Sequence, residues 1–582
     1  MQFISLIKVK NFKSIQDATF RLEKYTPIVG QNNAGKSNII ASLKWLLKKE
    51  KLGEEVFYDR TQPIEVEGVI TGITEDILNL LGTTHREKIV EFIENQNIKI
   101  KRIQDVPNAA VAQQKLMVFH PADKEWKLNP TGIENAIKAM FPESIEIGAM
   151  VDVADDVSRF KKSNTIGRLV AEILTEVEEA HAGTVKATLQ GIKDKFSADG
   201  SSRADELTAF DEAVSKKLQD IFPGIDIKLH VPTPELSDLF SSATIRLFEN
   251  QYDRDISLFG HGTQRSVQMA LIRHLAEIKQ TSETKTRTLL LIDEPELYLH
   301  PQAMEQVRAS LKYLSENGYQ VVFSTHSPQM IPAEDIKNTL LIRKTEQGTH
   351  ARKTLKEAVE QVEKSSSSQY QLLFSLENAN QILFSESVVL SEGKTEKRLL
   401  PYIFEKHFEQ TLGQKKIAFI EQGGVNNTVK ALEILKEMDI PCKAIIDLDF
   451  AFQGAIKQGL IGSDNESISK CKTIFSSNNE VKLNNGLPTK GGNLTAAQAY
   501  EWLAKQDDAK EHIQVLHDEL KEKGIWLWKL GAIEPYLGID ANTKREQAWA
   551  GVKQQIETSG LDAVIKDVEL TKMLEWLCEP VA

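Results

Sequence analysis

Cysteine is scarce in this sequence. Its 582 residues include three cysteines, Cys442, Cys471 and Cys578, which lie far apart and show no CxxC spacing. This usage excludes a disulfide framework and a cysteine-based zinc site. It is typical of a protein kept in a reducing compartment, so we expect a cytoplasmic location.

Long apolar runs are also missing. A stretch such as Thr288–Ile292 has the length of a strand and is far too short to span a membrane. The first residues alternate in the manner of a strand and lack the basic start and apolar stretch of a signal peptide. We therefore expect neither a signal peptide nor a membrane partner.

Positive charge is not in excess, because the net charge is −12. An acidic average weakens a DNA-binding hypothesis slightly. It does not exclude one, because metal-binding carboxylates add negative charge and basic patches can be local. The short basic runs at 48–51 and 161–162 are interpreted as solvated faces.

The length predicts two or more domains. Residues 1 to about 50 are predicted as two strands, a loop and a helix, and Ile64–Ile70 and Asn97–Ile103 alternate as antiparallel strands. Apolar residues at helical spacing over Thr165–Phe196 and again over Leu207–Phe222 predict an αα-hairpin. Two interpretations of this hairpin stay open, a packed arm of the first domain and a dimerisation arm.

A phosphate-binding loop is predicted at Gly30-Gln-Asn-Asn-Ala-Gly35-Lys36-Ser37, which matches G-x-x-x-x-G-K-[ST] in full. It lies between a strand, Thr26–Val29, and a helical run, Asn38–Leu47. Backbone N–H groups in such a loop converge on phosphate oxygens at a helix N-terminus. Lys36 is expected to reach the β- and γ-phosphates, and Ser37 to hold Mg²⁺. The ATP-binding residues predicted in this loop are Gly30, Asn32, Asn33, Gly35, Lys36 and Ser37.

A partner motif supports this prediction. The apolar strand before Asp293 ends in two acids, Asp293 and Glu294. We expect Asp293 to organise the Mg²⁺ shell and Glu294 to polarise the attacking water. The alternative is a buried strand that ends in a solvated acidic turn. The phosphate loop earlier in the chain disfavours this alternative.

Two further motifs narrow the class of ATPase. His326, in Ser324-Thr-His326-Ser, follows another apolar strand and suits contact with the γ-phosphate; the alternative is a satisfied loop histidine. Gly260, Gly262 and Gln264 open a helix and are expected to cap the nucleotide of an opposite subunit; the alternative is an ordinary helix N-terminus. Together the motifs resemble the SMC-like branch of ABC ATPases over roughly residues 1–345. That resemblance implies that two heads sandwich ATP.

A second catalytic centre is predicted from acids at strand ends. Glu392 follows the strand that begins at Val388, with Glu396 in the next helical turn, and Asp447 and Asp449 follow a second apolar strand. Strand alternation is expected to put both aspartates on one side. Converging carboxylates repel one another unless a cation neutralises them, and oxygen ligands suit Mg²⁺ or Mn²⁺.

This ordered pair of strands resembles the Toprim fold, and Gln422-Gly423-Gly424 fits its glycine turn. A third apolar run ends in Gly531-x-x-Glu534. An ATPase head followed by such a Toprim segment resembles the OLD (overcoming lysogenization defect) family of ATP-dependent endonucleases along essentially the whole chain. The family implies two-metal cleavage of DNA, with Glu534 helping to bind the second metal. It also implies a catalytic lysine, for which Lys529, Lys544, Lys553 and Lys566 remain open candidates.

The predicted fold is α/β, with an N-terminal ABC/SMC-like ATPase that carries an inserted helical hairpin, and a C-terminal Toprim domain. The predicted boundaries are 1–155 and 225–350 for the ATPase, 156–224 for the hairpin, 351–380 for a connector and 381–582 for the Toprim domain.

The predicted function is ATP-regulated cutting or nicking of double-stranded DNA, catalysed by Glu392, Asp447 and Asp449 with Glu294 and His326 at the ATP site. One Mg²⁺ is expected with ATP and two Mg²⁺ or Mn²⁺ ions at the Toprim site. The resemblance also implies phage defence, a homodimer or homotetramer, and a helicase or retron partner where the protein does not act alone. The alternatives are an SMC-like repair ATPase whose Toprim module only binds DNA or a partner and, less favoured, a topoisomerase, a primase or a transporter ATPase.

Overall fold

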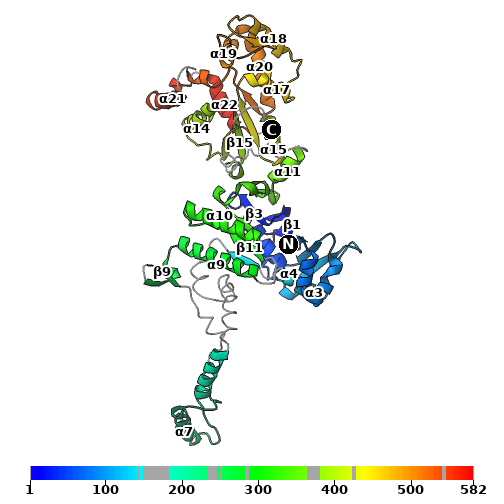
Figure 1. Ribbon diagram of the computed structural model, residues 1–582, viewed down its shortest axis with the longest axis vertical. Coiled ribbons are helices and arrows are strands. Elements are labelled where there is room, and N and C mark those ends of the chain that lie inside the picture. Colours follow the sequence, from blue (N-terminus) through cyan, green and yellow to red (C-terminus); the bar gives the residue numbers. More distant parts are fainter. Residues whose placement is uncertain are drawn as a thin grey trace. The chain divides into compact units, whose positions relative to one another are not determined.

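The computed structural model divides the chain into two compact units. The first comprises residues 1–26 and 37–330, and the second comprises residues 27–36 and 331–582. The structure describes residues 2–140, 144–147, 183–232, 246–249, 252–281, 288–362, 381–422, 428–539, 545–565 and 567–580. Figure 1 shows the elements of both units, which are treated separately below.

An antiparallel sheet builds one part of the first unit. Its strand order is β2-β1-β4-β5-β6-β7, and the bounds are β1 Phe3–Phe12, β2 Ile15–Arg21, β4 Ile64–Thr71, β5 Asn97–Gln104, β6 Lys115–His120 and β7 Glu125–Leu128. Alternate residues of β4 and β5 are buried, as expected for a sheet with one covered face. Helix α1 (Lys36–Leu47) packs so closely that a Cβ on Gly68 would meet Leu46 Cδ2 at 2.4 Å.

The predicted antiparallel lobe is therefore confirmed, because β4 and β5 pair from Ile64–Gln104 to Thr71–Asn97. The prediction of two strands before the phosphate loop is wrong. Three strands precede it, β1, β2 and β3 (Tyr25–Gly30). Asn11 and Lys13 adopt positive φ angles, which lets the chain reverse between β1 and β2 without a glycine.

Parallel strands build the other part of the first unit. β11 (Thr288–Asp293) pairs in parallel with β12 (Tyr319–Ser324) and β8 (Ile145–Ile147), and helix α10 (Pro301–Glu316) connects β11 to β12. The predicted order of strand, acidic loop, helix and strand is thus confirmed. Because β11 and β12 are in register at Asp293 and Ser324, the loops that follow them meet at one edge of the sheet.

The predicted helical hairpin is seen in part. Residues 183–196 are helical, a turn follows, and α7 spans Asp205–Gln219, while residues 165–182 lie outside the described residues. An ion pair between Arg203 and Asp211 (2.7 Å) holds the turn against α7. The helix ends before Phe222, which the apolar spacing had included, and Phe210 and Phe222 are exposed.

The second unit contains a four-stranded parallel sheet of order β16-β15-β17-β20. Its strands are β15 Ser387–Ser391, β16 Ile417–Glu421, β17 Cys442–Ile446 and β20 Ile525–Leu527, and the larger helices around them are α14 Lys394–Phe408, α15 Thr428–Glu437, α18 Glu466–Ser476, α19 Ala496–Ala504, α20 Asp507–Glu522, α21 Arg545–Ser559 and α22 Val568–Cys578. In β15, Val388 and Leu390 face one hydrophobic cluster while Val389 faces another. Both faces of the sheet are therefore covered, which explains its almost continuous apolar strands.

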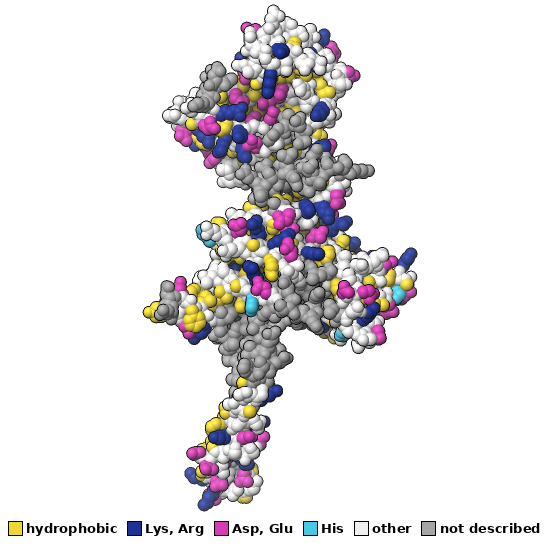
Figure 2. Space-filling view, in the orientation of Figure 1, with side chains coloured by type: hydrophobic (Ala, Val, Ile, Leu, Met, Phe, Trp, Pro, Cys, Tyr) yellow, Lys and Arg dark blue, Asp and Glu magenta, His cyan; other side chains and the backbone are white. Residues whose placement is uncertain are grey.

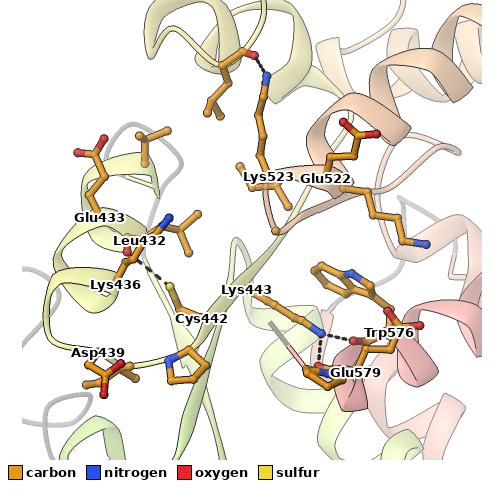
Figure 3. Close-up of a pocket in the computed structure, with 18 of the residues that line it drawn as sticks. Leu432, Glu433, Lys436, Asp439, Cys442, Lys443, Glu522, Lys523, Trp576 and Glu579 are labelled. Atoms are coloured by element: carbon orange, nitrogen blue, oxygen red, sulfur yellow. Dashed lines mark hydrogen bonds between the residues drawn. The ribbon is translucent and has the colours of Figure 1, made fainter. Parts of the chain in front are cut away.

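A groove of about 990 Å³ lies at the amino ends of β17 and β20 (Figure 3). Lysines and acids both line it, among them Lys436, Asp439, Lys443 and Glu579. Lys443 is buried, its Nζ donates to the carbonyl oxygens of Trp576 and Glu579, and it lies 4.6 Å from the Trp576 ring centroid. The ammonium group thus anchors the end of α22 to the sheet.

We expect Lys443→Met to lower the free energy of unfolding by about 1–3 kcal/mol, because two carbonyls lose their charged donor. Thermal melting followed by circular dichroism measures this loss. The exposed Lys436→Met, on the same groove, is the control and should change stability by less than about 0.5 kcal/mol. Equal melting temperatures for the two variants would contradict the anchoring role.

Within the described residues, the helices are all too short or too polar to cross a membrane.

Candidate active sites

The phosphate loop is shaped by left-handed backbone. Gly30 and Gly35 have φ angles of +157° and +102°, and a Cβ on Gly30 would lie 2.5 Å from Ile342 O, so only glycine fits there. The buried Lys36 directs its Nζ to Gly30 O (3.1 Å) and Gln31 O (3.0 Å). Its amine therefore lies over the loop at which phosphates are expected. Asn32 and Asn33 are exposed on the same loop.

The proposed Mg²⁺ residues of the ATP site meet in the first unit. Ser37, at the start of α1, donates from Oγ to Asp293 Oδ2 at 2.7 Å, and Ser324 Oγ donates to Asp293 Oδ1. Asp293 ends β11 and Ser324 ends β12, so register alone places them side by side. A hydroxyl and a carboxylate that converge in this way form a donor set that fits Mg²⁺.

Glu294 and His326 also come together. His326 Nε2 lies 3.3 Å from Glu294 Oε1, and both side chains are about one-third exposed. Glu294 has a φ angle of +49°, and its N–H donates to Ser324 O (3.2 Å) and to Ser324 Oγ (3.1 Å). This left-handed turn sets Glu294 apart from Asp293, so the two adjacent acids face different partners.

The signature-like residues lie around the start of α9 (His261–Thr281), after the short helical turn Ile256–Leu258. Gly260 has open space at its Cβ position, whereas a Cβ on Gly262 would approach Tyr298 O at 3.0 Å. Gln264 is buried and donates to Phe259 O (2.8 Å), so its amide points inward in this subunit. Its contact with a nucleotide of another subunit stays a prediction.

Sequence reasoning missed two residues here. Arg265 is buried and donates to the carbonyl oxygens of Asp293 (3.3 Å) and Glu294 (3.2 Å). Glu296 accepts at Oε1 from Thr325 Oγ1 and from the His326 N–H, both at 2.7 Å. Each lies within two residues of a chosen motif residue, but that adjacency does not show which groups the side chain contacts.

Carboxylates gather in the second unit at the carboxyl ends of its parallel strands. Glu392 follows β15 and accepts a hydrogen bond at Oε2 from the Asp447 N–H (3.0 Å), which follows β17. Glu396, in the first turn of α14, is buried. On its visible face this unit carries a group of acidic side chains (Figure 2).

Burial and mutual repulsion raise the pKa values of these acids. Burial, with smaller effects of Asp449 and Glu396, raises the pKa of Glu392 to about 7. Burial and the charge of Glu534 raise the pKa of Glu396 to about 7, and burial beside Glu392 raises the pKa of Asp447 well above its usual range. These carboxylates are therefore close enough to oppose one another's ionisation.

The argument that strand alternation puts Asp447 and Asp449 on one side is wrong. β17 ends at Ile446, Leu448 has helical backbone angles (φ −59°, ψ −32°), and Asp449 begins a short helix, α16 (Asp449–Phe452). Both residues nevertheless act on Glu392, Asp449 through its charge and Asp447 through its backbone N–H. Although Asp449 is exposed, the surrounding protein still desolvates it and raises its pKa.

Glu534 joins the same group from the segment after β20. Leu448 N–H donates to Gly531 O (2.8 Å), which ties this segment to the loop after β17. Glu534 Oε1 accepts from Thr395 Oγ1 (2.7 Å), beside Glu396 on α14.

Sequence reasoning missed Glu501 on α19, whose pKa is raised by burial and, less strongly, by Glu534. The long sequence separation left no signal for Glu501.

A divalent cation fits this cluster by one structural criterion. Asp447 Oδ1 is buried and lacks a hydrogen-bond partner among the described residues, which is costly unless a cation or water satisfies it. No three such acids, histidines or cysteines in the described part of the chain are arranged as a finished metal site. The two findings agree, because charges influence one another over longer distances than ligands coordinate.

The lysine candidates are not brought to the carboxylates by any described contact. Lys529 Nζ pairs with Glu569 Oε2 (2.8 Å) and donates to Gln514 (2.7 Å), and Lys553 lies over the Tyr402 ring. Lys544 and Lys566 lie outside the described residues, as do Gly423 and Gly424 of the predicted glycine turn. The catalytic lysine therefore stays open.

Comparison with known proteins shows which family the chain belongs to. Residues 26–331 match the family model "AAA domain, putative AbiEii toxin, Type IV TA system", and residues 383–449 match "Overcoming lysogenization defect protein-like, TOPRIM domain". The Old nuclease of Escherichia phage P2 is 37% identical over 587 residues, covering 99% of each chain. The chain belongs to the Old nuclease family. It is thus an enzyme, an ATP-dependent nuclease, and the predicted order of ATPase and Toprim domains in an α/β fold is confirmed.

Two nucleases of lower identity also match the chain. The OLD nuclease of Thermus scotoductus is 21% identical and covers 76% of this chain and 81% of its own. Endonuclease GajA of Bacillus cereus strain VD045 is 21% identical and covers 69% of this chain and 68% of its own. Among solved structures, an SmcHead bound to the C-winged helix domain of ScpA covers 60% of this chain and 97% of its own, with 15% identity and a TM-score of 0.35.

Proposed function

We propose that this Old-family enzyme hydrolyses phosphodiester bonds of double-stranded DNA at the carboxylate cluster of the second unit. The observation that carries the proposal is that five acids from separate strands and helices influence one another's ionisation, and that the buried Asp447 Oδ1 has no hydrogen-bond partner among the described residues. The five are Glu392, Glu396, Asp447, Asp449 and Glu534. Acids at this density favour a cation, because their charges are otherwise uncompensated.

The acids are divided between two metal ions in this proposal. Glu392, Glu396, Asp447 and Asp449 would hold one Mg²⁺ or Mn²⁺, and Glu534 would help to hold a second. Divalent cations at such a site supply an activated water and neutralise charge on the leaving oxygen. Glu392 stays in register with Asp447 through the backbone hydrogen bond, and Thr395 orients Glu534. The chain's own contribution is therefore to fix the carboxylates before the phosphate arrives.

The ATP site has a parallel assignment. Gly30, Asn32, Asn33, Gly35 and Lys36 would hold the phosphates, and Ser37 and Asp293 would hold one Mg²⁺. Glu294 would polarise the attacking water, and His326, whose Nε2 lies 3.3 Å from Glu294 Oε1, would contact the γ-phosphate. Gly260, Gly262 and Gln264 would contact ATP held by another subunit, which requires at least a homodimer and is compatible with a homotetramer.

We propose the same domain boundaries as the sequence predicts. They are 1–155 and 225–350 for the ATPase, 156–224 for the hairpin, 351–380 for the connector and 381–582 for the Toprim domain. The hairpin is the proposed dimerisation arm, since several of its apolar side chains are exposed, among them Ile221 and Phe222. Phage defence in the cytoplasm, alone or beside a helicase or retron partner, is the proposed setting.

Removing metal tests the chemistry. We expect the wild-type protein to nick or cut supercoiled plasmid with Mg²⁺ or Mn²⁺, and EDTA to lower the rate at least about 10³-fold, because the metal provides the nucleophile. Gel electrophoresis of the plasmid forms measures the rate. Cleavage that persists in EDTA contradicts the proposal. Robust ATP hydrolysis without cleavage under any metal condition favours an ATPase whose Toprim domain only binds DNA.

A further inference from the structure

The turn after β11 and the loop after β12 are joined by one carboxyl group. Glu296 lies three residues beyond Asp293, and its Oε1 accepts from Thr325 Oγ1 and from the His326 N–H, each at 2.7 Å. The acceptor is shared by a side chain and the backbone of the loop that carries His326. Both hydrogen bonds of Glu296 Oε1 therefore come from the loop that carries His326.

The loop is also held by hydrogen bonds within itself. Thr325 is fully buried, and its hydroxyl, which donates its one hydrogen to Glu296, accepts a hydrogen bond from the Ser327 N–H (3.0 Å). The backbone of His326 itself is held by the hydrogen bond from its N–H to Glu296 Oε1. From that backbone the imidazole reaches Glu294, with Nε2 3.3 Å from Oε1.

We propose that Glu296 is a positioning residue for ATP hydrolysis, which holds His326 at the distance from Glu294 that the reaction needs. The inference rests on the roles proposed above for Glu294 and His326. Glu294 and Glu296 belong to one short turn. Glu294 contacts the His326 ring and Glu296 accepts from the His326 N–H, so this turn fixes both ends of the Glu294–His326 contact.

The electrostatic setting agrees with a structural carboxyl. Burial, and to a smaller extent the nearby Glu294 charge, raise the pKa of Glu296, while the two accepted hydrogen bonds oppose that rise. A residue that worked by its negative charge would be poorly placed here. A residue that works by accepting hydrogen bonds keeps that ability as a carboxylate, or as an amide at the same position.

The test is ATP hydrolysis by the full-length protein, with kcat and KM measured separately. Glu296→Ala should lower kcat about 10- to 100-fold, the effect of losing hydrogen bonds to a carboxyl group, and change KM less than about threefold. Glu296→Gln should retain kcat within about threefold. The exposed Glu305→Gln on α10 is the control and should match wild type, and melting curves verify that each variant is folded.

A double-mutant cycle separates positioning from general support of the fold. In a His326→Ala background, Glu296→Ala should cause almost no further loss, because its effect passes through His326. Equal losses in both backgrounds overturn the proposal, as does a Glu296→Gln variant as slow as Glu296→Ala. Glu294→Gln reports on the underlying function: if it hydrolyses ATP at the wild-type rate, the assignment of Glu294 fails, whatever Glu296 does.

Discussion

Glu392→Gln is expected to lower DNA cleavage at least about 10³-fold while leaving ATP hydrolysis within about twofold of wild type. Glutamine keeps an oxygen that accepts the Asp447 N–H, so the local backbone is preserved. It removes the negative charge that a cation needs in this cluster. The measurement is plasmid cleavage beside phosphate release from ATP, on the same preparations.

In EDTA and at a pH above the Glu392 pKa of about 7, the same variant should melt at a slightly higher temperature than wild type. Glu392 is opposed by Asp449, Glu396 and Glu534, and losing one charge relieves that repulsion when no metal is present. Glu511→Gln, an exposed acid on α20, is the matched control for both measurements. Wild-type cleavage by Glu392→Gln would remove this residue from the metal site, and a lower melting temperature would show that its carboxylate supports the fold.

Lys36→Ala is expected to lower ATP hydrolysis at least about 100-fold, because the loop loses the cation that meets the phosphate charge. The buried amine is held by Gly30 O and Gln31 O, so the loop itself presents it. The alanine variant leaves the glycines in place. Phosphate release and binding of a fluorescent ATP analogue distinguish loss of chemistry from loss of binding.

Lys36→Ala also shows how ATP acts on the nuclease. If ATP controls cleavage, plasmid cutting by this variant should no longer respond to added ATP, whereas metal dependence should persist. Lys48→Ala, beyond the end of α1, is the control for removing a lysine from the same region. ATP hydrolysis by Lys36→Ala at the wild-type rate would exclude the phosphate loop from catalysis.

Local motifs predicted most of the strands and helices on which the candidate sites lie. The phosphate loop, the Asp293–Glu294 strand and the strands before Glu392 and Asp447 were each found from contiguous residues. Such motifs combine a strand's apolar run with the residue types that its end requires, so both can be seen in one short window. Their adjacency in space followed from parallel pairing, as in the register of Asp293 with Ser324.

Errors arose where backbone changed direction. Three strands, not two, precede the phosphate loop, because residues 11–14 turn on non-glycine residues with positive φ angles. Asp449 was assigned to a strand edge by alternation, yet the chain becomes helical at Leu448. Alternation of buried and exposed residues cannot show where a strand ends. A helix as short as the one after β17 has too few residues to show a helical spacing of apolar residues.

By itself the sequence determined which chemistry the chain carries. Residue types at fixed spacing identify phosphate loops and strand-end acids, because backbone geometry over a few residues is nearly universal. Only the tertiary structure decided which distant side chains support those motifs. Packing between separate elements brings Glu296 to the His326 N–H and Arg265 to the carbonyls of Asp293 and Glu294. It also exposes Glu501 to the charge of Glu534, and no local spacing encodes such packing.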